Sequence, residues 1–212
     1  KSKTGRPPFA IETMLRIHYL QQWFGLSDPA MEEALHDMPV YREFAKLDGV
    51  LDEEVWSKAG GTGLFVDVGS GMPNPQVPSQ GEAKVFYDTQ FLYVGVEAYD
   101  KTVRGGWPAD AKDPHLWERD TVEIMVDPDG DGDNKDYYEI QVNPQNLVFD
   151  THYDDYNRPN GGGKGPFGHE EWTASAERAV VIHGTIDDDT DTDDGYTVEM
   201  KIPWSVFTKA KA

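Results

Sequence analysis

The sequence predicts a mainly β protein, an antiparallel β-sandwich preceded by a short N-terminal all-α extension of two or three helices. Three observations predict this fold class. Short runs of alternating apolar and polar residues recur after residue 80, Gly and Pro separate these runs, and helical spacing is confined to the first 48 residues. We therefore expect two domains, a helical segment at 1–48 and a β-sandwich at 49–212.

The helical segment is predicted from its apolar spacing. Apolar residues from Ile11 to Trp23 recur three or four positions apart, and Gly25 is a typical helix end. A second helix is expected with Ser27 or Asp28 as its cap and Pro29 in its first turn, and a third from Val40 to Leu47. We expect the apolar side chains of these helices to be core residues rather than ligand-binding residues.

The β-sandwich is predicted from seven runs with strand character. Leu92, Val94, Val96 and Ala98, for example, alternate with other residues and fall on one face of a strand. Turn signals between short runs favour antiparallel pairing in two packed sheets. The seven runs cover residues 82–88, 91–100, 121–126, 137–143, 147–153, 178–186 and 196–202.

Composition restricts the partners of the chain. The formal net charge is −20 at pH 7, of which residues 1–48 contribute −1 and the remainder −19. Such a field repels phosphate backbones, so nucleic acid is an unfavourable partner. No apolar run approaches the roughly 20 residues of a membrane span, so no membrane partner is expected. With no Cys among the 212 residues, disulfides and thiolate zinc sites are excluded.

Two neighbouring runs predict a polar platform. In 121–126 and 137–143 the apolar residues share one face, so pairing the runs as a hairpin leaves Glu123, Glu139, Gln141 and Asn143 together on the opposite face. Trp117 stands at the entrance of the first run. An indole beside carboxylate and amide groups suits a pyranose ring, which stacks its C–H surface and hydrogen-bonds its hydroxyls. Ordinary outward-facing polar residues are the alternative interpretation.

The loop between these runs is dense in carboxylates. Gly132 takes the sixth position of a calcium-loop pattern, but Tyr138 stands at the twelfth, where such a loop has Glu. The loop is therefore either an oxygen-ligand site for structural calcium or a solvated acidic turn. The candidate metal ligands are Asp127, Asp129, Asp131 and Asp133. The second acidic run, 187–195, is predicted to be a solvated turn.

Catalysis is the weaker interpretation of the same residues. Glu123 and Glu139 offer a carboxylate pair of the type that glycosidases use. No obvious deep cleft is predicted, however, and no nucleophile elbow, zinc-protease motif or phosphate loop is present. The histidines are scattered along the sequence, at 115, 152, 169 and 183 among others. We therefore expect a protein that is not an enzyme and has no catalytic residues.

Five segments between residues 47 and 207 resemble the family 9 carbohydrate-binding modules. They read, in order, "LDGVLDEEVWSKA", "VFYDTQFLYVGVEAYD", "LWERDTVEIMVDPDGDG", "YYEIQVNPQN" and "GYTVEMKIPWSVF". The resemblance implies a non-catalytic, sugar-binding β-sandwich, found extracellularly or in the periplasm, in some members with structural calcium. It implies that Trp117 stacks on sugar and that Glu123 hydrogen-bonds it, with polar residues of the next strand, here Gln141 and Asn143, also in contact.

The resemblance also has a departure. In that family further strands and a second stacking aromatic follow the "IPW" segment, whereas this sequence ends at Ala212. Trp107 and Trp172, both in predicted loops, are the candidates for that second aromatic. A free sheet edge is also expected, which favours a homo-oligomer. The N-terminus "KSKTGRPPF" shows no signal-peptide core, so the localisation stays open.

Residues 5–48 resemble the N-terminal helical domain of insertion sequence 5 group transposases. The two resemblances meet at "KLDG", residues 46–49, and imply a fusion that is natural or engineered. The acidic catalytic domain of those transposases has no counterpart in the sequence, so no transposition is implied. Two alternatives to sugar binding therefore remain: a structural or interaction module, or chimera, without a ligand, and a DNA-binding remnant of a transposase.

Overall fold

The computed structural model describes residues 27, 47–74, 76–77 and 79–208. The two or three helices predicted over residues 1–48 therefore lie almost entirely outside the described residues. In the described part, the only α-helix is the five-residue α4, Glu54–Lys58. Residues 53–58 belong to one compact unit, and residues 48–52 and 59–208 belong to another. The predicted boundary after residue 48 stays a prediction.

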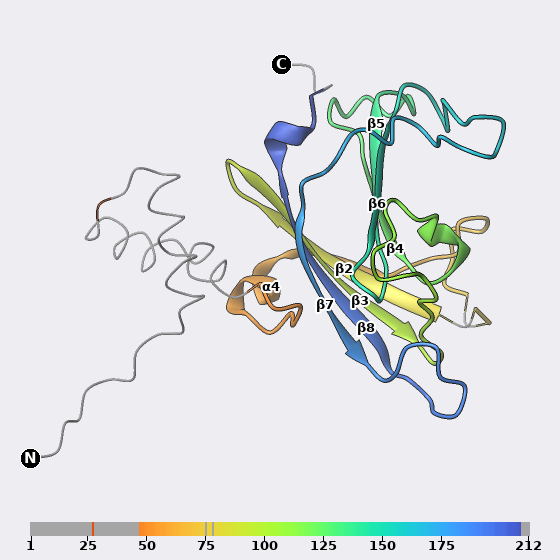
Figure 1. The fold of residues 1–212 in the computed structure, drawn as a ribbon. Coiled ribbons are helices and arrows are strands. Elements are labelled where there is room, and N and C mark those ends of the chain that lie inside the picture. Colours follow the sequence, from red (N-terminus) through yellow and green to blue (C-terminus); the bar gives the residue numbers. More distant parts are fainter. Residues whose placement is uncertain (1–26, 28–46, 75, 78, 209–212) are drawn as a thin grey trace, which may run out of the picture. The chain divides into compact units, whose positions relative to one another are not determined.

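The second unit consists of two antiparallel sheets, which lie as two layers in Figure 1. One has the strand order β1-β2-β3-β8-β7 and the other has the order β4-β5-β6. The strands are β1 Gly60–Leu64, β2 Ser79–Tyr87, β3 Phe91–Asp100, β4 Val122–Val126, β5 Tyr137–Val142, β6 Val148–Tyr153, β7 Glu177–His183 and β8 Gly195–Pro203. Two short 3-10 helices, η1 Leu116–Glu118 and η2 Trp204–Val206, flank them.

All seven predicted strand runs are confirmed as β2 to β8. The β1 strand was not predicted, because its sequence "GGTGL" has no apolar alternation and its residues are exposed along their whole length. It pairs with β2 at the outer edge of the larger sheet, where it needs no buried face. No helix among the described residues is long and apolar enough to cross a membrane.

The hydrophobic core lies between the two sheets. Side chains of β3 and β8 from the larger sheet and of β5 from the smaller sheet form one buried cluster, as expected for a β-sandwich. The alternation predicted for both sheets is thereby confirmed. Buried members of these strands include Val94, Val96, Ile140, Val142, Val198 and Met200.

The segment before α4 is fastened to β8. The backbone N–H of Gly49 donates to Glu199 Oε2 at 3.0 Å, and Thr197 Oγ1 donates to the Gly49 carbonyl at 2.8 Å. Gly49 has a φ of 83°, and a Cβ at this position would lie 3.1 Å from Val181. Gly49, at the joint between the two predicted domains, is therefore a packed part of the sandwich.

The acidic run 187–195 is a solvated turn only in part. Asp193 is 3% exposed, so the prediction is wrong for this residue. Its Oδ2 accepts the Val103 N–H at 2.7 Å, and its Oδ1 accepts the Thr185 N–H at 2.7 Å. A buried carboxylate that satisfies two backbone donors connects two loops at one end of the sandwich.

We expect Asp193→Ala to lower the free energy of unfolding by roughly 1–3 kcal/mol, because the buried Val103 N–H and the partly buried Thr185 N–H lose their acceptor. Urea denaturation measures this change. Asp194→Ala is the matched control, since Asp194 is exposed and uses its backbone N–H rather than its side chain to bond His183. Equal unfolding midpoints for the two variants would contradict this role of Asp193.

Candidate functional site

The β4–β5 hairpin places Glu123 beside Gln141. The two residues are direct partners in the antiparallel register, and Gln141 Nε2 donates to Glu123 Oε2 at 3.0 Å. Glu139 is paired with Met125, two residues away on each strand. The alternate residues of both strands pack into the core. The predicted grouping of Glu123, Glu139 and Gln141 on one face is therefore confirmed.

This face continues across β6, which sequence reasoning missed. Phe149 is the register partner of Gln141, and Thr151 is the partner of Glu139. The alternation in run 147–153 and the tight turn after Asn143 contained the signal, because together they fix the register of β6 against β5. We define the outer face as the side of the β4–β5–β6 sheet that carries Glu123, Glu139, Gln141, Phe149 and Thr151.

Trp117 lies over the Phe149 end of the outer face. Its ring centroid is 4.9 Å from that of Phe149 and 5.0 Å from that of Phe167, with both rings near perpendicular to the indole. The ring of His115 stacks on Trp117 at 4.5 Å. Trp117 nevertheless keeps 39% of its surface exposed. The adjacent Leu116 is fully buried and anchors η1, so the indole is held in place with an accessible surface.

The two glutamates of the outer face differ in exposure and have raised pKa values. Glu139 is 6% exposed, and its burial raises its pKa to about 7, with a further contribution from the charge of Glu123. Glu123 is exposed at the edge strand; partial desolvation raises the pKa of its carboxyl, and the hydrogen bond from Gln141 opposes this rise. Near neutral pH the face therefore offers both carboxylate acceptors and a carboxylic O–H donor.

Asn143 shapes one end of the site instead of presenting its amide at the surface. It is 1% exposed, and its Oδ1 accepts the Leu147 N–H at 2.9 Å, which closes the β5–β6 turn. Its Nδ2 donates to Gln145 Oε1 at 3.4 Å. The predicted position of Asn143 on the outer-facing side of β5 fits the register, but its amide is committed to the turn.

Gln145 in turn holds the loop that contains Trp107. Its Oε1 accepts the Trp107 N–H at 3.0 Å, and its Nε2 donates to the Trp107 carbonyl at 2.9 Å. Gly105 permits this approach, because a Cβ there would lie 2.7 Å from the Gln145 side chain. Asn143 and Trp107 are thus linked through Gln145, a residue that the sequence did not single out.

Two polar atoms near this chain of contacts are buried without a hydrogen-bond partner among the described residues. They are Oε1 of Gln141 and Nε1 of Trp107. An unsatisfied buried polar group costs about 1–3 kcal/mol, so such groups usually mark a place where a water molecule or a ligand completes the structure. Part of the unmet hydrogen-bonding capacity of the described residues therefore lies at the outer face and next to it.

Trp172 does not belong to the outer face. Its ring lies 4.7 Å from that of Tyr138, a core-facing residue of β5, and its Nε1 donates to the Val206 carbonyl at 3.1 Å. It also packs against the core cluster. The expectation that Trp172 is a second stacking aromatic for Trp117 is therefore wrong, because the sheet separates the two indoles.

The acidic loop brings three of its four aspartates together. Carboxylate oxygens of Asp127, Asp129 and Asp131 lie within 4.8 Å of one another. Asp127 also accepts the backbone N–H groups of Gly130 and Gly132 at 3.2 and 3.0 Å. Asp133 turns away and pairs with Lys135, whose Nζ is 3.2 Å from Oδ2. The first three aspartates fit the oxygen-donor chemistry of calcium, and Asp133 does not join them.

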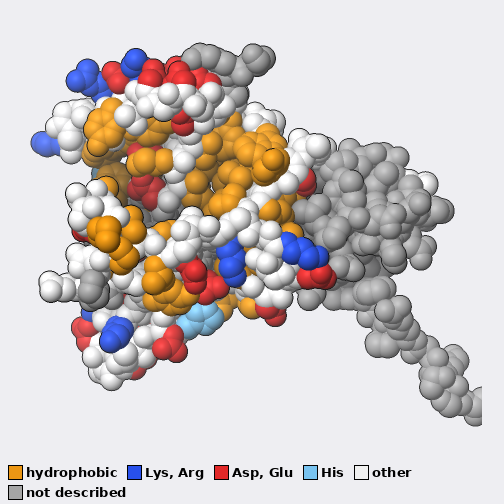
Figure 2. Space-filling model, turned by 180° about the vertical axis from the view of Figure 1, so that it is seen from behind, with side chains coloured by type: hydrophobic (Ala, Val, Ile, Leu, Met, Phe, Trp, Pro, Cys, Tyr) orange, Lys and Arg blue, Asp and Glu red, His pale blue; other side chains and the backbone are white. Residues whose placement is uncertain are grey.

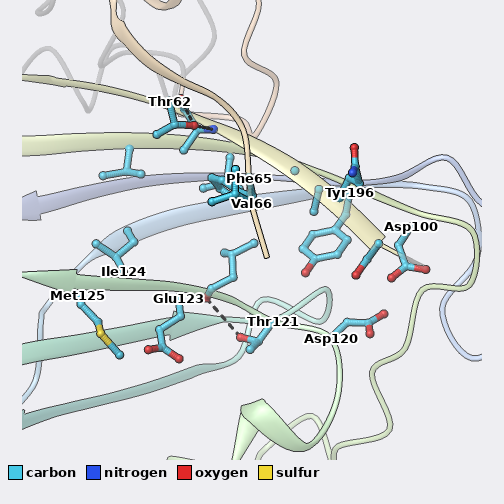
Figure 3. Close-up of a pocket in the computed structure, with 18 of the residues that line it drawn as sticks. Thr62, Phe65, Val66, Asp100, Asp120, Thr121, Glu123, Ile124, Met125 and Tyr196 are labelled. Carbon is cyan, nitrogen blue, oxygen red and sulfur yellow. Dashed lines mark hydrogen bonds between the residues drawn. The ribbon is translucent and has the colours of Figure 1, made fainter. Parts of the chain in front are cut away.

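A cleft of about 990 Å³ opens between the sheets on the β4 side, contrary to the expectation of no deep cleft. Figure 3 shows Phe65 and Val66 on one wall and Ile124 on the other, while Glu123 points away from the space. Figure 2 shows hydrophobic side chains gathered around a hollow in this side of the molecule. Among the described residues, β4 has a strand partner on one edge only. The walls are mainly apolar, with Asp100 and Asp120 together at one end (Figure 3), and Glu139 is not part of the lining.

A family model described as "Carbohydrate family 9 binding domain-like" matches residues 47–212, and a model described as a transposase domain matches residues 1–59. The two matches overlap at residues 47–59, close to the predicted meeting point. Both predicted resemblances are thereby confirmed.

Two solved structures of family 9 carbohydrate binding modules from Caldicellulosiruptor kristjanssonii are similar to this chain. One, in complex with cellotriose, is 19% identical, with a TM-score of 0.45, over 74% of this chain and 62% of that one. The other, in complex with glucose, is 18% identical, with a TM-score of 0.44, over 79% of this chain and 66% of that one. The chain thus spans less than two thirds of the length of either structure.

We expect Glu139→Gln to remove a pH-dependent loss of stability. The folded-state pKa of about 7 exceeds the ordinary value of 4.5, so the folded protein binds more protons between these values. Its free energy of unfolding therefore falls as pH rises through this window, by up to about 3 kcal/mol. Urea denaturation from pH 4.5 to 7.5 measures the free energy of unfolding of both proteins. The free energy by which the wild type exceeds the variant should decrease as the pH rises. Parallel curves of unfolding free energy against pH for wild type and Glu139→Gln would contradict the assignment.

Proposed function

Because the chain belongs, over residues 47–212, to the carbohydrate family 9 binding domain-like family, we propose that it binds carbohydrate at the outer face of the β4–β5–β6 sheet without catalysing a reaction. One observation carries this proposal: a half-exposed, well-anchored Trp117 lies at the end of a row formed by Glu123, Gln141 and Phe149. The family is described as a binding domain, which agrees with a non-catalytic role.

The chemistry of the outer face suits a sugar ring. A pyranose presents an apolar C–H surface that packs on an aromatic ring and a rim of hydroxyls that need both donors and acceptors. Trp117 supplies the exposed aromatic surface. Glu123 supplies carboxylate oxygens, and protonated Glu139 supplies a donor. Oε1 of Gln141 is an acceptor that becomes satisfied if a ligand hydroxyl reaches it after a small side-chain movement.

The affinity should be modest. Each protein–sugar hydrogen bond replaces a hydrogen bond to water, which leaves a net gain of only about 0.5–1.5 kcal/mol. Glu139 and Gln141 are nearly buried, so Trp117 and the edge at Glu123 supply most of the accessible contact area. We expect one or two sugar units to account for most of the contact.

One observation favours a second candidate function, that of an interaction module. The unpaired edge of β4 and the apolar cleft beside it form a surface that a strand of another chain can complete. This candidate requires no sugar, and the predicted homo-oligomer belongs to it. A DNA-binding role of the transposase-like segment stays a prediction that the net charge of −20 disfavours.

We expect Trp117→Ala to weaken sugar binding by about tenfold or more, because the stacking surface is lost. Isothermal titration calorimetry of the full chain with a panel of soluble oligosaccharides, beginning with cellotriose and glucose, measures this change. Tyr87→Ala is the matched control, since Tyr87 is a 76% exposed aromatic residue on the larger sheet.

Two results would contradict this proposal. Equal affinities of Trp117→Ala and Tyr87→Ala would place the sugar elsewhere. The absence of binding by the wild type to every member of the panel would favour the interaction module.

We also propose that the acidic loop binds structural calcium through Asp127, Asp129 and Asp131. The grouping of their oxygens within 4.8 Å supports this proposal. Calcium would neutralise carboxylates that otherwise repel one another, and it would fix the connection between β4 and β5.

Calcium should raise the melting temperature of EDTA-treated wild type by about 3 °C, since a ligand that binds only the folded state stabilises it. Asp129→Asn should abolish this rise. Asp133→Asn should retain it, because Asp133 is paired with Lys135. Differential scanning calorimetry with and without calcium makes the comparison, and an unchanged melting temperature of the wild type would contradict the proposal.

A further inference from the structure

Two histidines that are far apart in the sequence lie side by side in the fold. His152 is in β6, and His169 follows the loop after it. The backbone N–H of His169 donates to the His152 carbonyl at 2.7 Å, and the two imidazole rings stack with centroids 5.3 Å apart and an interplanar angle of 19°. The interpretation of the histidines as scattered is therefore wrong for this pair.

The loop is built for this close approach. Gly168 has a φ of 73°, and a Cβ on it would lie 2.4 Å from Thr151 Oγ1 and 2.6 Å from the His152 carbonyl oxygen. Thr151 Oγ1 also donates to the Phe167 carbonyl at 2.7 Å. Only glycine fits here without strain, so the backbone fixes His169 next to β6.

A carboxylate completes the cluster. Asp154 Oδ2 lies 2.8 Å from His169 Nε2. One ligand atom from each of His152, Asp154 and His169 can be chosen so that all three lie within 4.8 Å of one another. Donors around a tetrahedral zinc ion are about 3.3 Å apart, given bond lengths of about 2.0–2.2 Å. Small side-chain rotations therefore bring the three groups to ligand distance.

The surroundings of the cluster match those of a metal site. Metal-bound histidines usually donate their other ring N–H to a carboxylate. Here Nδ1 of His169 lies 3.2 Å from Glu171 Oε1, on the ring side away from Asp154. A third carboxylate is close as well, since Asp136 Oδ1 lies 3.9 Å from His152 Nε2. Two imidazoles with carboxylates on both sides form a mixed nitrogen and oxygen donor set.

We propose that His152, Asp154 and His169 bind a divalent metal ion of the zinc class. Imidazole donors favour zinc and its first-row neighbours over calcium and magnesium, which take oxygen ligands. The ion would tie the loop before His169 to the end of β6. Because Phe167 in this loop packs against Trp117, the site would also stiffen the support of the exposed indole.

The proposed metal site is separate from both sites described above. His152 is the register partner of Tyr138, whose ring lies in the core, so the cluster lies on the other side of the sheet from Glu123 and Gln141. None of its three ligands belongs to the acidic loop 127–133. Its occupancy can therefore be measured in the absence of sugar and of calcium.

A metal-free ion pair is the competing interpretation of the same contacts. The Asp154 carboxylate raises the pKa of His169, with a further contribution from Glu171, as expected if a protonated imidazole is paired with two carboxylates. Such an ion pair would need only His169 and its carboxylates. A zinc titration distinguishes the two interpretations.

The experiment is isothermal titration calorimetry of zinc chloride into the EDTA-treated full chain, prepared without a polyhistidine tag. We expect one saturable site that persists in excess calcium. His169→Gln and Asp154→Asn should each weaken zinc binding by about 10–100-fold. His183→Gln is the matched control, since His183 is exposed at the end of β7 and lies outside the cluster; its zinc affinity should equal that of the wild type.

Cobalt substitution gives a second readout that does not depend on heats. Cobalt in a site of tetrahedral nitrogen and oxygen ligands should give visible absorption bands in the wild type and in His183→Gln, and these bands should be lost in His169→Gln. Circular dichroism spectra that coincide for all variants would exclude unfolding as the cause. No saturable zinc binding by the wild type, or equal zinc affinities of His169→Gln and His183→Gln, would overturn the proposal.

Discussion

The register of the β4–β5–β6 sheet is the constraint on which the rest of the structure depends. Side chains alternate along a strand, so a single register decides which residues enter the core and which line the outer face. Pairing Glu123 with Gln141, and Gln141 with Phe149, places Ile140 and Val142 in the core. A slip of one residue would bury Glu123 and expose Ile124. The hydrophobic core therefore determines the composition of the outer face.

The sequence predicted which segments form strands and on which face of the sheet each side chain lies, because both follow from local alternation. All seven strand runs were predicted, and so was the grouping of Glu123, Glu139 and Gln141. The β1 strand was not, since a Gly-rich edge has no apolar pattern. The resemblance to family 9 modules, which rested on five segments in order, was likewise confirmed by the match over residues 47–212.

Residues in loops were harder to place, because tertiary packing rather than periodicity decides where they point. Trp107 and Trp172 looked equivalent in the sequence, yet one is held beside the β5–β6 turn and the other packs on the core side of β5. Asp193 stood in a run of exposed aspartates but is buried between two loops. His152 and His169 meet through a backbone hydrogen bond that no sequence pattern indicates.

The loop between β6 and β7 contacts both the outer face and the histidine cluster. Phe167 in this loop contacts Trp117 at the outer face, and His169, two residues later, joins His152 and Asp154. A metal ion at the histidine cluster would reduce the conformational freedom of the loop and so preorganise the indole for a ligand. Sugar binding and metal binding would then be coupled through packing, although no ligand is shared between the two sites.

The most direct test of the central claim is a titration of the ¹⁵N-labelled chain with an oligosaccharide, followed by two-dimensional NMR. The largest shifts should fall on the indole and amide signals of Trp117 and on the side-chain amide of Gln141. The indole signal of Trp172, on the core side of the sheet, should stay unchanged. Shifts confined to Phe65, Ile124 and other residues that line the cleft would contradict sugar binding at the outer face, because the ligand would then occupy the space between the sheets.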